Sequence, residues 1–229
     1  MLLFNTDLLL DDPFAFFVLF AAVAFALVIG ISVHEFSHAA AANLQGDDTA
    51  KRLGRLTLNP LAHLHPTGTI LLVVAGFGFG RPVPVNPFRL RSGRRGMAMV
   101  SAAGPASNVV LAIVFAGLFQ SGLIDTNELS PQALHPDDIA AWVTLTTIYA
   151  VHLNLLLAMF NLLPVYPLDG GGILAGLAPQ AALPLVGKLQ KLGPPVLLTV
   201  LALTLVTDIN VLGPLFGPVN ALADRLIGT

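Results

Sequence analysis

The sequence contains no cysteine among its 229 residues. This absence excludes disulfide bonds, thiolate metal sites and thiol catalysis, so a bound metal ion would need histidine, aspartate, glutamate or asparagine ligands. Charged residues are also scarce, at 10% of the chain against about 25% in soluble globular proteins. Because 55% of the residues are hydrophobic and the mean hydropathy is +0.80, too little polar material is present to enclose a soluble core. The composition therefore predicts an integral membrane protein.

Three apolar runs are long enough to cross about 30 Å of hydrocarbon as α-helices: Phe14–Ile31, Met97–Phe119 and Ile139–Leu163. A fourth run, Val196–Val219, is a weaker candidate because polar residues and a proline interrupt it: Asp208, Asn210 and Pro214. The first run does not have the pattern of a signal peptide, since acidic rather than basic residues precede it: Asp7, Asp11 and Asp12. We expect an all-α polytopic membrane protein with three core transmembrane helices and one or more C-terminal membrane segments.

The distribution of basic residues predicts the orientation of these spans. Ten of them lie either between the first and second spans or after the third: Lys51, Arg52, Arg55, Arg81, Arg89, Arg91, Arg94, Arg95, Lys188 and Lys191. The loop between the second and third spans contains acidic residues and no lysine or arginine. Because cytoplasmic loops of membrane proteins are enriched in lysine and arginine, we expect the N-terminus to lie outside and the two basic stretches to lie in the cytoplasm.

The segment "VIGISVHEFSHAAAANL", Val28–Leu44, places three ionisable residues at the end of the first span. His34 and His38 are four residues apart, so on a helix both imidazoles lie on one face and can bind one ion, with Glu35 beside them. His34 lies about 32 Å along a straight helix from Pro13, near the cytoplasmic boundary. The alternative is a chance match to this short motif. Because ionisable groups in a membrane segment are costly unless they are used, we favour a metal site.

A catalytic zinc ion takes three protein ligands and one water molecule, so a third ligand must come from elsewhere. The expected topology places most other carboxylates on the opposite side of the membrane. Asp47 and Asp48 are on the same side as the histidines, but they follow Gly46 in what we interpret as a solvated turn. Asp169, in "NLLPVYPLDGGGIL" after the third span, is the best candidate, because the prolines and glycines around it allow the backbone to turn back toward the bilayer. The alternative for Asp169 is a turn residue or a helix cap.

Four motifs together resemble the site-2 protease family of intramembrane zinc metalloproteases, peptidase family M50: "HEFSH" at His34–His38, "GRLTLNPLAHLHPTGTILL" from Gly54, "AAGPASN" ending at Asn108 and "NLLPVYPLDGG" from Asn161. The resemblance implies one Zn²⁺ ion bound by His34, His38 and Asp169, with Glu35 as the general base. It also implies that Asn161, eight residues before the aspartate, stabilises the substrate carbonyl. The chain departs from the family pattern at His65, where an aspartate is expected.

The core motifs span residues 28–172, and we interpret residues 1–229 as a single intramembrane metalloprotease domain without a separate regulatory domain. Gly68–Pro87 is too short in its apolar part to span the membrane and is rich in glycine and β-forming residues. We interpret it as a re-entrant loop or β-hairpin whose edge pairs with an extended substrate; the alternative is an ordinary interfacial loop.

The remaining polar residues of the spans receive weaker assignments. His152 and Asn154 lie within the third span, where a hydrogen bond to a neighbouring helix is favoured over a role in the site. Asn108 is assigned equally to the site and to close helix packing. His63, His65 and His135 are interpreted as solvent-exposed or interfacial side chains.

The residues favour a membrane zinc enzyme that hydrolyses peptide bonds, and the resemblance implies that these bonds lie in or near transmembrane segments, as in regulated intramembrane proteolysis. The expected partners are a transmembrane protein substrate and the lipid bilayer, with no nucleic acid, and the expected location is a prokaryotic-type cell membrane with the site near the cytoplasmic face. No serine-protease signature such as Gly-x-Ser-x-Gly occurs, and a pair of carboxylates at membrane depth is lacking. The alternative is a membrane metal-binding transport or scaffold protein without proteolytic activity, which would not need Glu35.

Overall fold

A computed structural model describes residues 10–65, 80–126, 138–206 and 213–228. Its three longest apolar helices are α2 (Pro13–Leu44), α5 (Gly93–Gln120) and α6 (Ile139–Leu162). Among the described helices, these three have the length and composition to cross a membrane, which confirms the three predicted core spans. All regular secondary structure in the described residues is helical, apart from one isolated bridge between Leu64 and Gly80.

Acidic residues cap the N-terminal ends of two of these helices. Asp12 accepts a hydrogen bond from the backbone N–H of Ala15 at 2.9 Å, and Pro13 occupies the first turn of α2, where its missing N–H is not needed. Asp138 accepts in the same way from Ala141 at the start of α6. The acidic residues that argued against a signal peptide thus include the cap of the first spanning helix.

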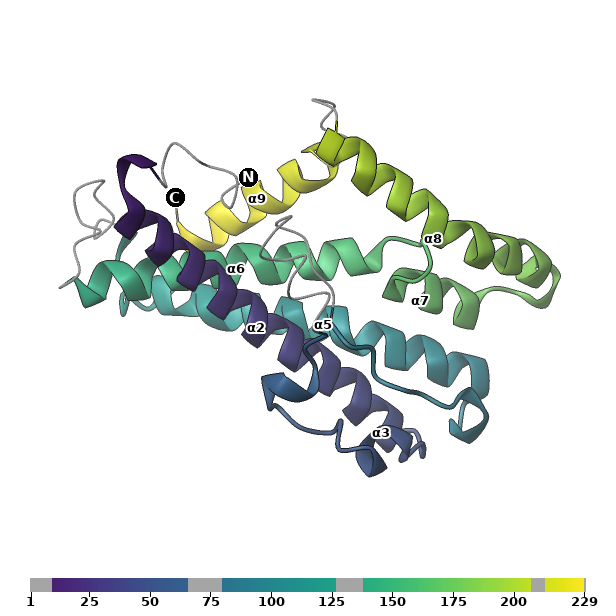
Figure 1. The fold of residues 1–229 in the computed structure, drawn as a ribbon. Coiled ribbons are helices and arrows are strands. Elements are labelled where there is room, and N and C mark those ends of the chain that lie inside the picture. The colour runs from purple at the N-terminus through teal and green to yellow at the C-terminus, as the bar shows by residue number, and fades with distance from the viewer. Residues whose placement is uncertain (1–9, 66–79, 127–137, 207–212, 229) are drawn as a thin grey trace.

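Small residues allow the three long helices to pack closely. α2 contacts both α5 and α6, and α5 contacts α6 (Figure 1). The buried positions of α2 include Ala22, Ala26 and Gly30, and those of α5 include Ala112 and Ala116. Without a hydrophobic driving force between helices in lipid, such small residues let backbones approach and gain van der Waals contact. Large apolar side chains instead face outward, as expected of a surface that meets lipid: Phe17, Phe25, Val110, Ile113 and Val114.

The C-terminal third forms three further helices, α7 (Asp169–Leu177), α8 (Leu183–Val206) and α9 (Gly213–Ile227). α7 packs on α5, and the Arg94 side chain at the start of α5 donates to the carbonyl of Ala178 at the end of α7. α9 packs on α5 and α6, whereas α8 contacts mainly α7 and the short turn before it (Figure 1). The predicted fourth run is divided between α8 and α9, and a membrane location for these helices stays a prediction.

The link from α2 to α5 contains the short helix α3 (Thr49–Arg52), the turns η2 (Pro60–Ala62) and η3 (Pro87–Arg89), and an extended stretch between them. We call this stretch, Arg81–Asn86, the proline segment. The predicted re-entrant loop or β-hairpin at Gly68–Pro87 falls largely on residues 66–79, which lie outside the described residues. Leu64 and Gly80, which form the isolated bridge, lie on either side of residues 66–79 in the sequence.

Asp47 connects the end of α2 to the proline segment. Its carboxylate is fully buried and accepts hydrogen bonds from the backbone N–H of Asn86 at 2.6 Å and from the N–H and hydroxyl of Thr49. The interpretation of Asp47 as a solvated turn residue was therefore wrong. Burial alone would raise the pKa of Asp47, but these hydrogen bonds, together with the charge of Arg89, outweigh burial and lower it.

We expect Asp47→Asn to destabilise the protein by about 1–3 kcal/mol at neutral pH, because one acceptor oxygen is replaced by a donor facing buried N–H groups. Since the folded pKa is lowered, the stabilisation is present above the unfolded pKa of about 4 and is lost as the pH falls through the folded value. Thermal unfolding in detergent at pH 7 measures the first effect, and a series of measurements from pH 4 downward measures the second. The exposed neighbour Asp48 provides the control, and equal stability of Asp47→Asn and Asp48→Asn would contradict this account.

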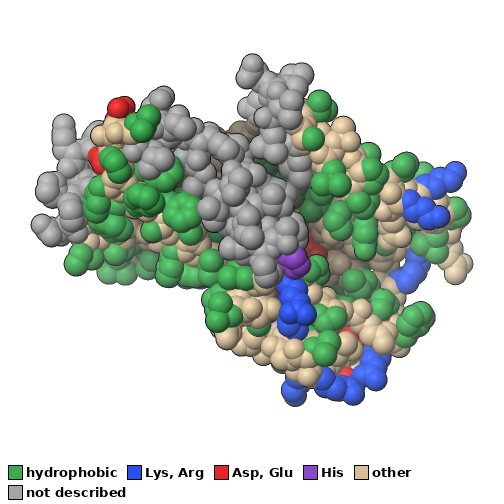
Figure 2. All heavy atoms as spheres, viewed as in Figure 1, with side chains coloured by type: hydrophobic (Ala, Val, Ile, Leu, Met, Phe, Trp, Pro, Cys, Tyr) green, Lys and Arg blue, Asp and Glu red, His purple; other side chains and the backbone are tan. Residues whose placement is uncertain are grey.

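Most lysine and arginine side chains lie at one end of the molecule; Arg225, in the last turn of α9, is an exception. Figure 2 shows them where α2 ends, where α5 begins and where α8 begins, while hydrophobic side chains cover much of the opposite half of this face. All three long helices have one terminus at this end, because α2 and α6 run toward it and α5 runs away from it (Figure 1). Charge therefore distinguishes the two ends of the bundle.

Candidate metal centre

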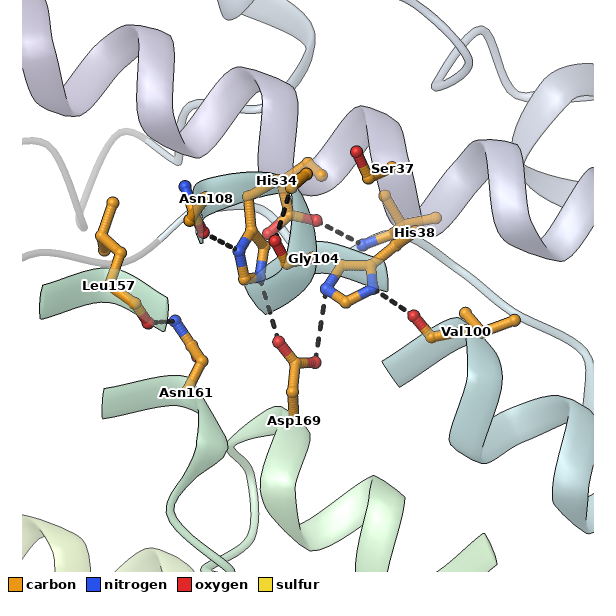
Figure 3. A network of polar contacts seen from close by, with 12 residues as sticks. His34, Ser37, His38, Val100, Gly104, Asn108, Leu157, Asn161 and Asp169 are labelled. Atoms are coloured by element: carbon orange, nitrogen blue, oxygen red, sulfur yellow. Dashed lines mark hydrogen bonds and ion pairs between the residues drawn. The ribbon is translucent and has the colours of Figure 1, made fainter. Parts of the chain in front are cut away.

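His34, His38 and Asp169 converge on one point although they come from α2 and from the start of α7 (Figure 3). The distance from His34 Nε2 to Asp169 Oδ2 is 3.0 Å, and that from His38 Nε2 to Asp169 Oδ1 is 3.3 Å. Both imidazoles are buried, and the candidate ligand atoms all lie within 4.8 Å of one another. The three predicted ligands are thus within one coordination sphere.

The position of Asp169 depends on how closely α7 packs against the end of α6. After Leu162 the chain turns through a stretch with two prolines and re-enters helix at Asp169. A Cβ on the following residue, Gly170, would lie 2.3 Å from the carbonyl oxygens of Leu162 and Leu163. Only glycine permits this approach, so the glycine run after Asp169 is what brings its carboxylate back to the histidines.

The other nitrogen of each imidazole is held by a buried acceptor. His34 Nδ1 lies 2.6 Å from Asn108 Oδ1, and His38 Nδ1 lies 2.7 Å from the carbonyl oxygen of Val100 (Figure 3). The Asn108 amide is oriented by its own donations to the carbonyl of Gly30 and to Asn154 Oδ1. Since both partners are acceptors, each Nδ1 carries the hydrogen, and each Nε2 presents a lone pair.

The donor set fits a zinc ion. With hydrogen on each Nδ1, the two Nε2 lone pairs and the Asp169 carboxylate face one another with no hydrogen between them. These electron-rich groups repel one another, and a bound cation stabilises them. Ligand atoms around a tetrahedral ion with bonds of 2.0–2.1 Å are about 3.3 Å apart, and the observed separations are 3.0 and 3.3 Å. Space for the ion exists because residue 104 is glycine: a Cβ there would lie 2.5 Å from Nε2 of both histidines.

Glu35 lies beside these ligands at the wall of a cavity of about 580 Å³. Its Oε2 accepts a hydrogen bond of 3.2 Å from the backbone N–H of Val83 in the proline segment. The cavity is bounded by α2, the proline segment, α5, α6, α7 and α8, and its lining includes all three metal ligands. The carboxylate is thus positioned next to the space where an ion and a substrate would meet.

Asn161 also lines this cavity, from the last turns of α6. Its Nδ2 donates to the carbonyl oxygen of Leu157 at 3.0 Å (Figure 3). An amide nitrogen has two hydrogens, so this bond leaves one hydrogen for another acceptor. The catalytic role expected of Asn161 stays a prediction.

Several supporting residues were assigned wrongly or weakly from the sequence. Asn108 proves to be fully buried and to contact His34, which resolves its two alternatives in favour of the site. Asn154 makes the expected interhelical hydrogen bond, and its partner is Asn108. His63 is fully buried, with Nε2 2.7 Å from the carbonyl oxygen of Thr57, so its interpretation as an exposed side chain was wrong. Within the family resemblance, the position of Asn108 in "AAGPASN" was the one signal that pointed to the site.

Comparison with known proteins supports the same chemistry. The profile that describes peptidase family M50 matches residues 22–203. The chain is 44% identical over 153 residues to "Putative zinc metalloprotease YwhC" of Bacillus subtilis, a match that covers 67% of each chain. It is 32% identical over 168 residues to "Putative zinc metalloprotease Rip2" of Mycolicibacterium smegmatis, covering 71% of this chain and 59% of that protein.

A third relative, matched over a shorter stretch, has a similar name. "Putative zinc metalloprotease MJ0611" of Methanocaldococcus jannaschii is 34% identical over 107 residues, which cover 47% of this chain and 48% of that protein. The chain therefore spans between about half and two thirds of the length of these relatives. No solved structure matches it significantly.

Proposed function

The chain belongs to peptidase family M50, and on that premise we infer that it is a zinc metalloprotease that hydrolyses peptide bonds in or near transmembrane segments of other proteins. One observation supports this function above all: a carboxylate, Glu35, lies between two metal-ligating histidines in sequence and beside them in the cavity. A site that only binds a metal has no need of that carboxylate, so the alternative of a transport or scaffold protein is not favoured.

The residues of the site have separate tasks in this proposal. When bound by His34, His38 and Asp169, zinc supplies Lewis-acid activation of water and of the scissile carbonyl. Glu35 accepts a proton from the attacking water and passes it to the leaving amine. The free N–H of Asn161 donates a hydrogen bond to the developing oxyanion. The buried acceptors Asn108 and Val100 keep both imidazoles in the tautomer that presents Nε2 to the metal.

The surroundings of the site support action on membrane proteins. The two histidines belong to a helix of 32 residues that is apolar enough to cross a bilayer, and the cavity beside them is lined mainly by apolar side chains. The basic residues at the near end of the bundle (Figure 2) favour a cytoplasmic location for that end. We propose that cleavage near this face releases a cytoplasmic product or removes a membrane remnant, as in regulated intramembrane proteolysis.

The direct test is cleavage of a model single-pass membrane protein by the purified protein in lipid nanodiscs. We expect cleavage within or next to the transmembrane segment, loss of cleavage after treatment with a zinc chelator, and recovery on adding one equivalent of Zn²⁺. Mass spectrometry of the products locates the cleaved bond. Cleavage that persists after metal removal would contradict a zinc peptidase, and cleavage confined to soluble loops would contradict the intramembrane assignment.

A further inference from the structure

The proline segment is held at both ends by side chains from the turns that flank α3. At its start, Arg55 Nη2 donates to the carbonyl oxygen of Arg81, and the N–H of Arg81 donates to the carbonyl of His63 at 2.6 Å. At its other end, Asp47 accepts from the N–H of Asn86 at 2.6 Å. The position of the whole stretch is therefore fixed by contacts outside it.

The centre of the proline segment lies against Glu35. Proline has no N–H, so Val83 carries the only backbone donor between Pro82 and Pro84, and this donor is bonded to Glu35 Oε2 at 3.2 Å. A Cβ on Gly80, next to the segment, would lie 3.5 Å from Glu35 Oε1. Both oxygens of the carboxylate thus lie close to this backbone.

Arg55 is an unusual residue to find in such a turn. It is only 6% exposed, and its Nε has no hydrogen-bond partner among the described residues. Burial lowers the pKa of its guanidinium, and the nearby charge of Glu35 opposes that shift. A buried, incompletely bonded cation is costly to fold. The exposed Arg52, three residues earlier, forms an ordinary surface ion pair with Asp48 instead.

We propose that Arg55 is a positioning residue for Glu35. By holding the carbonyl of Arg81, it keeps the proline segment in the place where the N–H of Val83 orients the Glu35 carboxylate at the cavity wall. This inference rests on the proposed role of Glu35 as general base. Arg55 itself does not line the cavity, so it acts through the segment and not on the substrate.

The kinetic test compares Arg55→Met, Arg55→Lys and Arg52→Met in the zinc-loaded full-length protein. We expect Arg55→Met to lower kcat by about 10- to 100-fold, as when a catalytic group is displaced by about 1 Å, with KM changed less than about threefold and zinc content unchanged. Arg55→Lys retains the charge and one donor, and recovers part of kcat. Arg52→Met behaves as the wild type. A raised KM with unchanged kcat would overturn the inference, because that pattern belongs to a segment that holds the substrate.

Hydrogen–deuterium exchange over residues 80–86 provides a readout that does not depend on cleavage. Exchange at these residues is expected to be faster in Arg55→Met than in the wild type, intermediate in Arg55→Lys and unchanged in Arg52→Met. Equal exchange in all four proteins would overturn the inference even if Arg55→Met were inactive. If the wild type cleaved nothing, the proposed function would fail, and the exchange rates would still decide whether Arg55 holds the segment.

Discussion

Replacing Glu35 with glutamine is expected to abolish peptide cleavage while leaving the bound metal in place. Glutamine has nearly the same shape as glutamate and retains an oxygen that can accept the hydrogen bond from Val83, but it cannot take a proton from water at neutral pH. General-base catalysis contributes about 10²- to 10⁴-fold to such reactions, so the rate should fall by that factor. The three metal ligands are untouched, so the affinity for zinc should not change.

The measurement pairs cleavage of a single-pass substrate with metal analysis of the same protein samples. Ser37→Ala provides a control on the same helix. Among the described residues, the Ser37 hydroxyl bonds only to the carbonyl of Val33 within α2, and Ser37 does not line the cavity. Wild-type cleavage by Glu35→Gln would end the peptidase proposal. Loss of zinc from Glu35→Gln would show instead that the carboxylate helps to hold the metal.

Replacing Gly104 with alanine is expected to abolish metal binding although no ligand is changed. The added methyl carbon would lie 2.5 Å from Nε2 of both His34 and His38, in the space that the ion needs at 2.0–2.1 Å from those nitrogens. The histidines cannot retreat easily, since each Nδ1 is bonded to a buried acceptor. We expect zinc affinity to fall by more than about 100-fold, beyond the usual effect of an outer contact, and cleavage to be lost with it.

Gly117→Ala is the matched control for this prediction. Gly117 lies on the same helix, α5, and a Cβ there would meet no atom of the described residues within 4 Å. Its replacement should therefore leave zinc binding unchanged and favour the helix slightly. Zinc titration of both variants, with circular dichroism to check helix content, separates loss of the site from loss of the fold. Stoichiometric zinc in a folded Gly104→Ala protein would contradict the placement of the ion.

The features that were predicted from the sequence are those encoded by local patterns. The apolar runs predicted α2, α5 and α6 because a membrane helix must satisfy its backbone internally and face lipid with apolar side chains. The pair His34 and His38 could be assigned to one face because helical spacing fixes their geometry. Asp169 was predicted because topology excluded most other carboxylates, and the structure brings it to the histidines.

The features that were missed depend on contacts between distant parts of the chain. Val83 bonds to Glu35 across 48 positions, and Asn86 bonds to Asp47 across 39. In both cases the donor is a backbone N–H, which nearly every residue has, so no pattern of residue types marks it. Burial of Asp47 and Arg55 could not be predicted for the same reason: a charged residue in a polar turn is normally exposed, and only the folded link between α2 and α5 encloses these two.

The hydrogen-bond chain from Asn154 through Asn108 to His34 has a consequence for the thermodynamics of metal uptake. Because these bonds, like the bond from His38 to Val100, join protein groups only, the conformational entropy of ordering the two rings is lost during folding and not during metal binding. The site is preorganised, so little of the binding free energy is spent on ordering side chains. Zinc should therefore act as a ligand of an already folded protein and raise its melting temperature in proportion to the logarithm of the free metal concentration.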